Sequence, residues 1–536
     1  MLKELPKSIE SRSGQLLIKL GIIKKHGKGI YFFTPFGMHL INNVKKELKD
    51  KLAKNNFSEI DIPIINLKNN FDDNGFFVSK DIDGKFYFTS GPDLYLYEDF
   101  LKSFIKSYKD LPVEFYYITK RAFNDNKASE ELLNSMVTEV YKSFYVSTQE
   151  NYEEKIKNYT KESLDFLKSF GIKPIAAKKN KDSQGIIYGW ANKKGREKSA
   201  YCSECNEYFD INYMEIIKKS GQDEEILEVE KIKTPNIKTI EDLQKFTGID
   251  IKKLIKAILI KVVDNNYVIF IRGDRELSKE KLAKLIKTDQ NLIKQAAEED
   301  LEYMETIGGF VGPIGLKNCQ LIVDEEVEYI RNGVAGANEK DYHLKNINYD
   351  RDFENSICGD LVVAGGEDLC PKCGSKIQLH NYYKIGELKD NTEICDKTTD
   401  IKYIDNTGRE KLTYKIENTL DLYKIISVSI EETEENLSKL LTWDTQILLL
   451  KPDDEDACML SEEIYVKLKN AGRNPLLDDR NMKVGHKFKE SEMLGLNEII
   501  VIGRRAEEGI VEYQNHDKNH KAEITLEELE KLLIHE

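Results

Sequence analysis

The segments YCSEC at residues 201–205 and LCPKC at residues 369–373 decide the architecture of this chain. Each contains a Cys-x-x-Cys pair, and the stretch between them is long enough to form a domain. Four thiolates suit a tetrahedral structural zinc if both pairs meet in space, so the intervening chain must leave one body and return to it. The alternative is two unrelated turns with chance cysteines. The predicted metal ligands are Cys202, Cys205, Cys370 and Cys373.

Composition limits the class of protein. A chain of 536 residues exceeds one hydrophobic core, so about three or four domains are expected. A net charge of −14 argues against nucleic acid coating the whole surface, although 80 Lys and Arg residues leave material for a local basic face. No stretch has the roughly 18 to 20 apolar residues of a membrane span, and the N-terminal residues lack the apolar core of a signal peptide. We expect a soluble, cytoplasmic protein with no DNA or membrane partner.

Apolar periodicity predicts a mixed α+β body. Residues 38–55 have helical spacing and precede a strand that ends near Pro63. Residues 111–120 indicate a strand, and residues 150–170 an amphipathic helix closed by Gly171. Strands, helices and a glycine-rich loop then predict a compact insert, and the tail alternates strands and helices in the manner of an α/β domain.

Several motifs stand in the order that one enzyme family shares. In chain order they are LLIKLGIIKKHGKGIYFFTPFG (16–37), SEIDIP (58–63), IRGDRELSKEK (271–281), GGFVGPIGL (308–316), LIVD (321–324), GVAGAN (333–338), YHLKNINYDRDF (342–353) and LLDDRNMKVGHKFKESEMLGLNEIIVIG (476–503). Together they resemble the bacterial-type prolyl-tRNA synthetases, class II aminoacyl-tRNA synthetases with an inserted editing domain. The likeness covers nearly the whole chain.

The resemblance implies an α+β multidomain fold. A class II synthetase-like catalytic body with an antiparallel sheet is expected in two parts, residues 1–223 and 357–440, each with one cysteine pair. An inserted α/β editing domain is expected at 224–356 and an α/β anticodon-binding domain at 441–536. The family includes zinc-bearing members with this insertion, which agrees with the cysteine spacing. It also implies a homodimer, built through the first class II motif, and tRNA(Pro) or a mimic of it as partner.

Three elements that the family uses for ligation are altered. The motif 2 arginine aligns with Phe123, the motif 3 arginine with Ile425 or Ile426, and the Thr-x-Glu of the proline pocket with Pro92 and Leu94. Adenylate formation needs fixed cations against the charge that develops at the α-phosphate, and apolar side chains cannot supply them. These positions are therefore expected to be degenerate.

Two alternatives stay open for ligation. Arg121 lies two residues before Phe123, and a bulge or a slipped register would bring it to the phosphate. The second alternative is a working, divergent ligase whose catalytic strand is misaligned. ATP and Mg²⁺ are expected as cofactors only if ligation is retained.

The editing motifs are complete by the same comparison. The resemblance places Lys281 against the terminal adenosine of charged tRNA, Gly312 and Pro313 in the amino-acid pocket, and Asp324 at the end of a strand. It also assigns a turn of Gly336, Ala337 and Asn338, whose backbone N–H groups approach the substrate, and His343 at the edge of the site. A solvent-facing lysine on a helix and a structural histidine are the alternatives for Lys281 and His343.

In the C-terminal motif, Arg480 and Lys487 are candidates for contact with the anticodon stem or its bases. The alternative is a helix-entry turn whose charges serve solubility.

Three functions remain. The favoured one is editing hydrolysis of mischarged, alanyl-type tRNA(Pro), with proline ligation lost or weak. The second is a working proline–tRNA ligase with a divergent active site. The third is a non-catalytic tRNA-binding regulator or a synthetase subunit.

Overall fold

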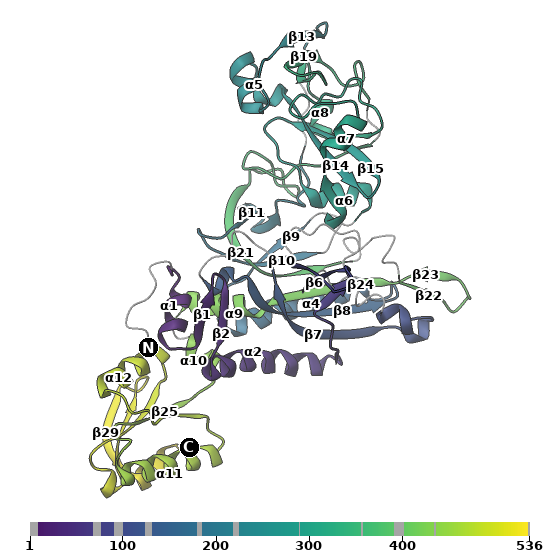
Figure 1. Cartoon of the computed structure of the whole chain (residues 1–536). Helices are drawn as coiled ribbons and strands as arrows, with labels where there is room; N and C mark the ends of the chain where they lie inside the picture. Colours follow the sequence, from purple (N-terminus) through teal and green to yellow (C-terminus); the bar gives the residue numbers. More distant parts are fainter. Residues whose placement is uncertain are drawn as a thin grey trace.

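The computed structural model describes residues 9–67, 77–89, 100–123, 131–179, 185–217, 224–288, 290–354, 357–390, 401–433 and 436–533. Figure 1 shows a body built on a broad sheet, an insert that projects beyond β11 and β21, and a smaller C-terminal unit next to α10. Among the described residues, no helix is long and apolar enough to cross a membrane.

The body is a nine-stranded sheet in the order β10-β9-β12-β11-β21-β24-β8-β7-β3. Neighbours are antiparallel except for the pairs β12–β9 and β3–β7. Its strands are β3 (Ser58–Glu59), β7 (Val113–Ala122), β8 (Val137–Ser147), β9 (Ile175–Lys178), β10 (Ile186–Ala191), β11 (Glu197–Cys202), β12 (Glu207–Asp210), β21 (Gln378–Lys389) and β24 (Tyr414–Asp421). The two strands that follow the insert, β21 and β24, therefore lie between strands that precede it, which confirms a largely antiparallel sheet built from both chain segments.

Helices cover one face of this sheet. They are α1 (Arg12–Lys19), α2 (Pro35–Lys54), α4 (Tyr152–Ser169), α9 (Leu422–Glu432) and α10 (Asn436–Leu441). The start of α2 is specified locally, because Pro35 is in its first turn and the Thr34 hydroxyl accepts from Gly37 N. Its buried residues follow a helical period and pack on Tyr116, Tyr141 and Tyr145 of the sheet.

The helix expected at 38–55, the strand at 111–120 and the helix at 150–170 are confirmed as α2, β7 and α4. The strand expected to end near Pro63 is shorter, because only Ser58 and Glu59 pair with β7.

The opposite face of the sheet carries a smaller apolar cluster. Tyr117 of β7 with Phe144 and Val146 of β8 packs there against Leu101, Ile105, Ile401 and Tyr403. The hairpins β1 (Ile23–Gly27) with β2 (Ile30–Phe33) and β22 (Lys402–Ile404) with β23 (Glu410–Leu412), and the three-stranded sheet of β4 (Ile65–Leu67), β6 (Phe86–Thr89) and β5 (Phe77–Lys80), lie outside the main sheet.

The insert contains two sheets. The larger has the order β16-β14-β15-β17-β20, from β14 (Ile255–Val262), β15 (Asn265–Arg272), β16 (Ile293–Gln295), β17 (Gln320–Asp324) and β20 (Ile357–Gly359). The smaller is β13 (Glu230–Lys233), β19 (Tyr342–Ile347) and β18 (Gly333–Gly336). The helices are α5 (Ile240–Thr247), α6 (Lys279–Ile286), α7 (Glu298–Tyr303) and α8 (Glu325–Glu328). β20 pairs with β17 and so belongs to the insert, although it lies beyond the expected boundary at residue 356. The boundary was placed too early because a strand this short leaves no signal in the sequence.

The C-terminal unit is an α/β layer structure. Its sheet has the order β26-β25-β27-β28-β29, formed by β25 (Thr445–Leu449), β26 (Pro475–Asp478), β27 (Glu498–Ile502), β28 (Ile510–Asn515) and β29 (His520–Thr525). The helices α11 (Glu455–Asn470), α12 (Val484–Leu494) and α13 (Leu526–Leu533) accompany it. The expected mixed α/β multidomain architecture is therefore confirmed.

Candidate functional site

The two cysteine pairs meet. The four sulfur atoms lie within 4.8 Å of one another, with Cys202 Sγ 3.5 Å from Cys373 Sγ and Cys205 Sγ 3.9 Å from Cys370 Sγ. Zinc–sulfur bonds of about 2.3 Å place the thiolates of a tetrahedral site roughly 3.8 Å apart. The donor set and its spacing therefore fit a structural zinc ion, and the expectation that the pairs come together is confirmed. That the metal is zinc remains a prediction.

Glycines bring two backbone segments of the insert into direct contact. A Cβ on Gly312 would lie 1.7 Å from Gly336 O, and a Cβ on Gly336 would lie 2.1 Å from Phe310 O. Asn338 fixes the contact, because its Oδ1 accepts from Gly312 N at 2.9 Å and its Nδ2 donates to Gly312 O at 2.9 Å and to Ile314 O at 2.8 Å. The loop with Gly312 and the buried Pro313 is thus held rigidly against β18.

The turn after β18 uses its own N–H groups. Ala337 N donates to Tyr342 O and Asn338 N donates to Phe310 O. Both N–H groups are used in hydrogen bonds within the protein, so the expectation that they approach a substrate directly is corrected. The Asn338 side chain instead fixes the neighbouring loop with Gly312.

His343 lies in the same group. Its Nδ1 is 2.6 Å from the hydroxyl of the buried Thr234, and its ring meets Phe310 edge to face with centroids 5.7 Å apart. Burial lowers the pKa of His343 to about 4, so the imidazole is neutral at physiological pH. A neutral ring held through Nδ1 is suited to hydrogen bonding rather than to charge stabilisation.

Lys281 and Asp324 form a second group. Lys281 Nζ lies 2.9 Å from both carboxylate oxygens of Asp360 and donates to Val362 O at 2.7 Å. Asp324 begins α8 by accepting from Glu326 N, and it also accepts from Leu361 N. Burial lowers the pKa of Lys281, although Asp360 opposes this, and raises the pKa of Asp324 to about 6. The ammonium of Lys281 is thus not solvent-facing.

The two groups are associated with different faces of the larger sheet. Val268 and Phe270 of β15 pack with Val311 and Ala335, next to the Gly312 loop, whereas Ile269 and Ile271 pack with Leu282 of α6. Successive side chains of a strand point to opposite faces. The structure therefore brings Gly312, Pro313, Gly336, Ala337, Asn338 and His343 together, and separately joins Lys281 to the Asp324 end of β17.

Of the expected ligation positions, Phe123 follows β7 at the face of the main sheet opposite the helices. By strand alternation, Arg121 and Tyr117 share this face on β7, and Thr138, Lys142 and Phe144 share it on β8. Phe123 follows the end of β7 and donates its N–H to Met136 O. Burial lowers the pKa of Arg121 to about 10, still high enough for a cation at neutral pH. Arg121 is thus on the correct face for the alternative of a slipped register.

Acidic residues occupy the neighbouring strand of this face. Glu417 of β24 is 4% exposed and lies 2.8 Å from Lys142 Nζ, and its Oε1 has no hydrogen-bond partner. Asp421 ends β24, accepts from Thr138 Oγ1 at 2.6 Å and caps α9. Burial raises the pKa of Glu417 to about 8 and also raises the pKa of Asp421, so both carboxyl groups hold protons more tightly than exposed ones.

Ile425 and Ile426 are fully buried in α9 and contribute to the apolar core. Helix α9 presents no cation at either position. Pro92 and Leu94 lie outside the described residues.

The two C-terminal candidates differ. Arg480 is half exposed and binds Asp478 and Glu490 at 2.7 and 2.6 Å, so its guanidinium is already paired. Lys487 is fully buried and donates to Leu449 O at 2.6 Å and to Asp478 O at 3.0 Å. The expected RNA contact of Lys487 is therefore corrected, because its ammonium has no exposed surface.

Comparison with known proteins shows which families and relatives this chain is similar to. Residues 234–353 match the family described as aminoacyl-tRNA editing domain, and residues 444–536 match the family described as anticodon binding domain. The proline–tRNA ligase of Sulfurihydrogenibium sp. is 28% identical over 97% of this chain and 95% of its own length. The proline–tRNA ligase of Finegoldia magna is 27% identical over 98% of this chain and 94% of its own length. The chain is prolyl-tRNA synthetase-like.

A solved structure was also found in the comparison. Prolyl-tRNA synthetase from Cryptosporidium parvum, complexed with halofuginone and AMPPNP, aligns with 97% of this chain and 76% of that chain. The TM-score is 0.49 and the sequence identity is 11%.

Sequence reasoning missed several residues of this synthetase-like chain. Asp360, the partner of Lys281, and Glu417, the partner of Lys142, lie outside the motifs that carried the resemblance. Polar residues recur along β24, among them Lys415 and Asn418, so the sequence carried no signal that Glu417 is buried.

Proposed function

We propose that this protein recognises tRNA(Pro), or a mimic of it, and hydrolyses mischarged, alanyl-type aminoacyl esters in its insert, with ATP-dependent proline ligation lost or weak. The observation that carries the proposal is the Gly312 loop, held against β18 by Asn338 within the segment that matches the editing family. A rigid loop of this kind suits a pocket that sorts small side chains by size.

The chemistry required is modest. Hydrolysis of an aminoacyl ester needs an aligned water molecule and a donor for the oxyanion, and no catalytic triad. A separate hydrolytic site is needed because one binding pocket discriminates poorly between small apolar side chains. We assign the amino-acid pocket to Gly312, Pro313 and Gly336, with His343 at its edge. Lys281 is assigned to the end of the site that takes the terminal adenosine, where it holds the returning segment through Asp360 and Val362 O, and Arg480 is assigned to the anticodon region.

Weak ligation follows from the main sheet. Phe123 and Ile425 align with positions where the family supplies arginines, and neither apolar side chain can stabilise the charge that develops at the α-phosphate. Loss of an arginine that stabilises a phosphoryl-transfer transition state costs roughly 10³- to 10⁵-fold in rate. ATP and Mg²⁺ enter this proposal only if some ligation remains. A homodimer formed through the body is part of the same proposal.

Deacylation of alanyl-tRNA(Pro) tests the hydrolase. The full-length protein is expected to release alanine, and Lys281→Ala is expected to reduce the rate by about 100-fold. Lys279→Ala changes an exposed lysine of the same helix and serves as the matched control. Equal rates for the protein and the uncatalysed reaction would eliminate the hydrolase, and retained tRNA binding would then leave the regulator.

A second candidate is a working proline–tRNA ligase. It is favoured by Arg121, a cation on the face of the sheet opposite the helices, and by similarity to proline–tRNA ligases along nearly the whole chain. Proline-dependent exchange of pyrophosphate into ATP separates the two candidates. Robust exchange that Arg121→Ala abolishes would establish the ligase.

A further inference from the structure

The metal-ligand segments and the insert share their connections. The chain enters the insert after β12, just beyond the first cysteine pair, and returns through residues 360–369 to the second pair. Ala364 N donates to Ile211 O at 2.9 Å, and Ile216 N donates to an oxygen of Asp360 at 3.0 Å. The outgoing and returning segments are thus bonded to each other at the base of the insert.

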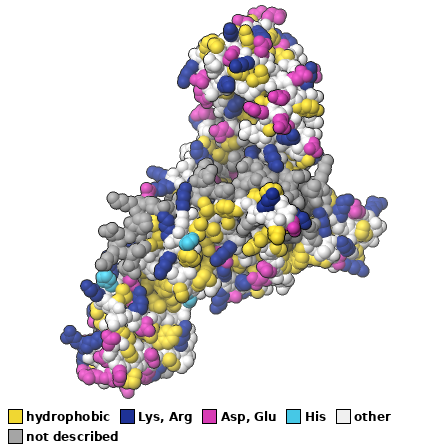
Figure 2. Space-filling view, viewed as in Figure 1, with side chains coloured by type: hydrophobic (Ala, Val, Ile, Leu, Met, Phe, Trp, Pro, Cys, Tyr) yellow, Lys and Arg dark blue, Asp and Glu magenta, His cyan; other side chains and the backbone are white. Residues whose placement is uncertain are grey.

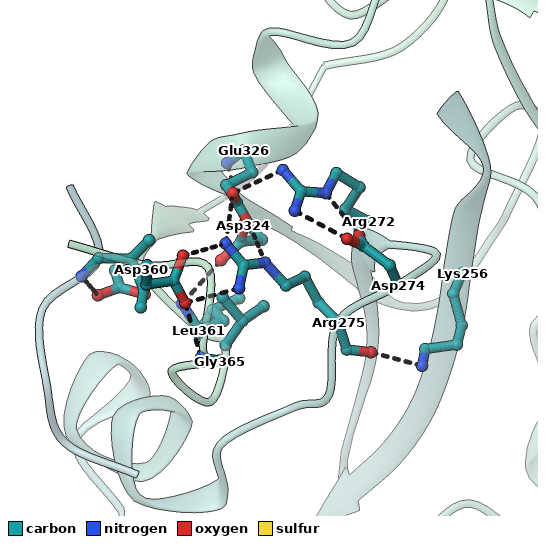
Figure 3. A network of polar contacts seen from close by, with 12 residues as sticks. Lys256, Arg272, Asp274, Arg275, Asp324, Glu326, Asp360, Leu361 and Gly365 are labelled. Carbon is teal, nitrogen blue, oxygen red and sulfur yellow. Dashed lines mark hydrogen bonds and ion pairs between the residues drawn. The ribbon is translucent and has the colours of Figure 1, made fainter. Parts of the chain in front are cut away.

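Arg275 bridges the editing residues and the second cysteine pair. Its guanidinium donates to Glu326 at 2.6 and 2.9 Å, and to Asp368 through two bonds of 2.7 Å. Glu326 lies in the first turn of α8, two residues after Asp324, and Asp368 lies two residues before Cys370. Figure 3 shows the Arg275 guanidinium directed toward Glu326, with Lys256 bound to the Arg275 carbonyl oxygen.

This bridge is largely removed from solvent. The exposed fractions of the side chains are 10% for Arg275, 13% for Glu326 and 7% for Asp368. Asp368 also accepts from Gly365 N at 2.7 Å, which fixes the carboxylate in the returning segment. Because the Arg275 guanidinium is hydrogen-bonded to a carboxylate on each side, it has little freedom to rotate, and a displacement of one carboxylate is passed on to the other.

Helix α6 joins the same base. Ser278 caps the helix and donates its hydroxyl to Asn212 O at 2.6 Å, two residues after β12. Lys281, in the first turn of the helix, binds Asp360 and Val362 O of the returning segment. Below the polar contacts, Cys202 and Cys370 pack in one apolar core with Ile269, Ile271 and Leu282 of the insert.

We infer that Arg275 is a positioning residue that couples the four-cysteine site to the editing residues: metal bound by the cysteines fixes Asp368, Arg275 transfers that position to Glu326, and Glu326 sets the Asp324 end of β17. The metal would be held by Cys202, Cys205, Cys370 and Cys373 and would cross-link the two connections. The inference rests on the proposed editing function for its catalytic consequence. The expected effect of the metal on the stability of α6 and α8 does not depend on that function.

The test uses the full-length, zinc-loaded protein. Asp368→Asn removes the charge that Arg275 holds, and Glu367→Gln changes the neighbouring exposed acid as a control. Three quantities are measured: zinc per chain, amide hydrogen exchange of α6 and α8, and the kcat and KM of alanyl-tRNA(Pro) deacylation. Asp368→Asn is expected to retain zinc, to accelerate exchange in α6 and α8 about 10-fold, and to lower kcat about 10-fold with KM within about 2-fold.

A second variant guards against simple misfolding. Arg275→Lys keeps the charge and loses the fork, and both its exchange rates and its kcat should lie between those of the wild type and Asp368→Asn. Removal of zinc from the wild type with a chelator should accelerate exchange in the same two helices. Glu367→Gln should match the wild type in every measurement.

The outcomes separate the inference from the proposed function. If zinc removal and Asp368→Asn accelerate exchange only next to the cysteines and leave α6 and α8 unchanged, the coupling is refuted, whatever the deacylation rate. If exchange in α6 and α8 responds while the wild type deacylates nothing, the coupling stands and the editing proposal falls.

Discussion

The backbone of Gly312 lies against the carbonyl oxygen of Gly336, so that a Cβ on Gly312 would stand 1.7 Å from that oxygen. No other residue type fits this approach without displacement of the loop. Because Asn338 bonds both the N–H and the carbonyl of Gly312, a displaced loop would also lose these bonds. The shape of the proposed amino-acid pocket therefore depends on the absence of one side chain.

Gly312→Ala should reveal this dependence. The clash with Gly336 O is expected to cost about 3 kcal/mol of stability and to abolish discrimination in deacylation. Gly308→Ala is the matched control in the same loop, because its Cβ would meet only Leu301 Cδ2 at 3.4 Å, an ordinary contact. Urea unfolding measures both variants. Equal stability of the two would show that the loop moves freely.

His343 predicts the pH dependence of the insert. Burial holds its folded-state pKa at about 4, below the ordinary value of 6.5. As the pH falls from about 6.5 to about 4, the unfolded chain takes up a proton that the folded chain resists, so stability falls with decreasing pH in this window. His343→Asn should remove that component, and deacylation by the wild type should show no inflection near pH 6.5. Thermal unfolding between pH 4 and 7 measures the pH dependence of stability, and an NMR titration measures the pKa of the imidazole. His26→Asn, at an exposed histidine, is the control.

The buried Glu417 leads us to expect that the stability of the body decreases as the pH rises. Burial raises its pKa from 4.5 to about 8. The folded chain therefore holds a proton that the unfolded chain releases, and this contribution to stability is complete below pH 4.5 and is lost as the pH rises through about 8. Glu417→Gln should flatten the decline in melting temperature between pH 5 and 8.5. Glu410→Gln, at an exposed residue paired with Lys402, should leave the wild-type slope, and an unchanged slope in Glu417→Gln would show that Lys142 keeps the carboxylate ionised.

Lys487 is expected to act on stability rather than on RNA. Lys487→Met removes the donor for Leu449 O and Asp478 O, which should cost about 2 to 4 kcal/mol. Filter binding of tRNA to the folded variant should give an unchanged affinity. Lys489→Met, at an exposed lysine of the same helix, should change stability by less than about 0.5 kcal/mol. A loss of tRNA affinity in folded Lys487→Met would restore the original expectation for this residue.

The cysteine cluster predicts about one zinc ion per chain. Cys370→Ser should abolish binding, whereas Cys458→Ser, outside the cluster, should retain it. Zinc at a thousandfold its Kd stabilises the folded chain by about 4 kcal/mol, so chelation should lower the melting temperature. Elemental analysis and calorimetry measure the two effects. A well-folded, metal-free protein that chelator does not destabilise would contradict the prediction.

Local patterns predicted much of the fold. The periodicity of residues 38–55 was sufficient to predict α2, because a helix is specified by neighbours in sequence, although the helix begins three residues earlier, at Pro35. The cysteine spacing predicted that two distant segments meet, because one metal ion needs all four ligands. The order of motifs predicted the insert and the C-terminal unit, which the family matches at 234–353 and 444–536 confirm.

The residues alone determined the periodic elements, the cysteine ligand set and the place of the insert. Only the tertiary structure decided that Lys487 is buried, that Lys281 is held by Asp360, and that Arg275 joins Glu326 to Asp368. The physical reason is that a charged side chain carries no sign of its partner in its own sequence neighbourhood. Its solvation and its pairing are set by segments brought together when the sheets and connections close.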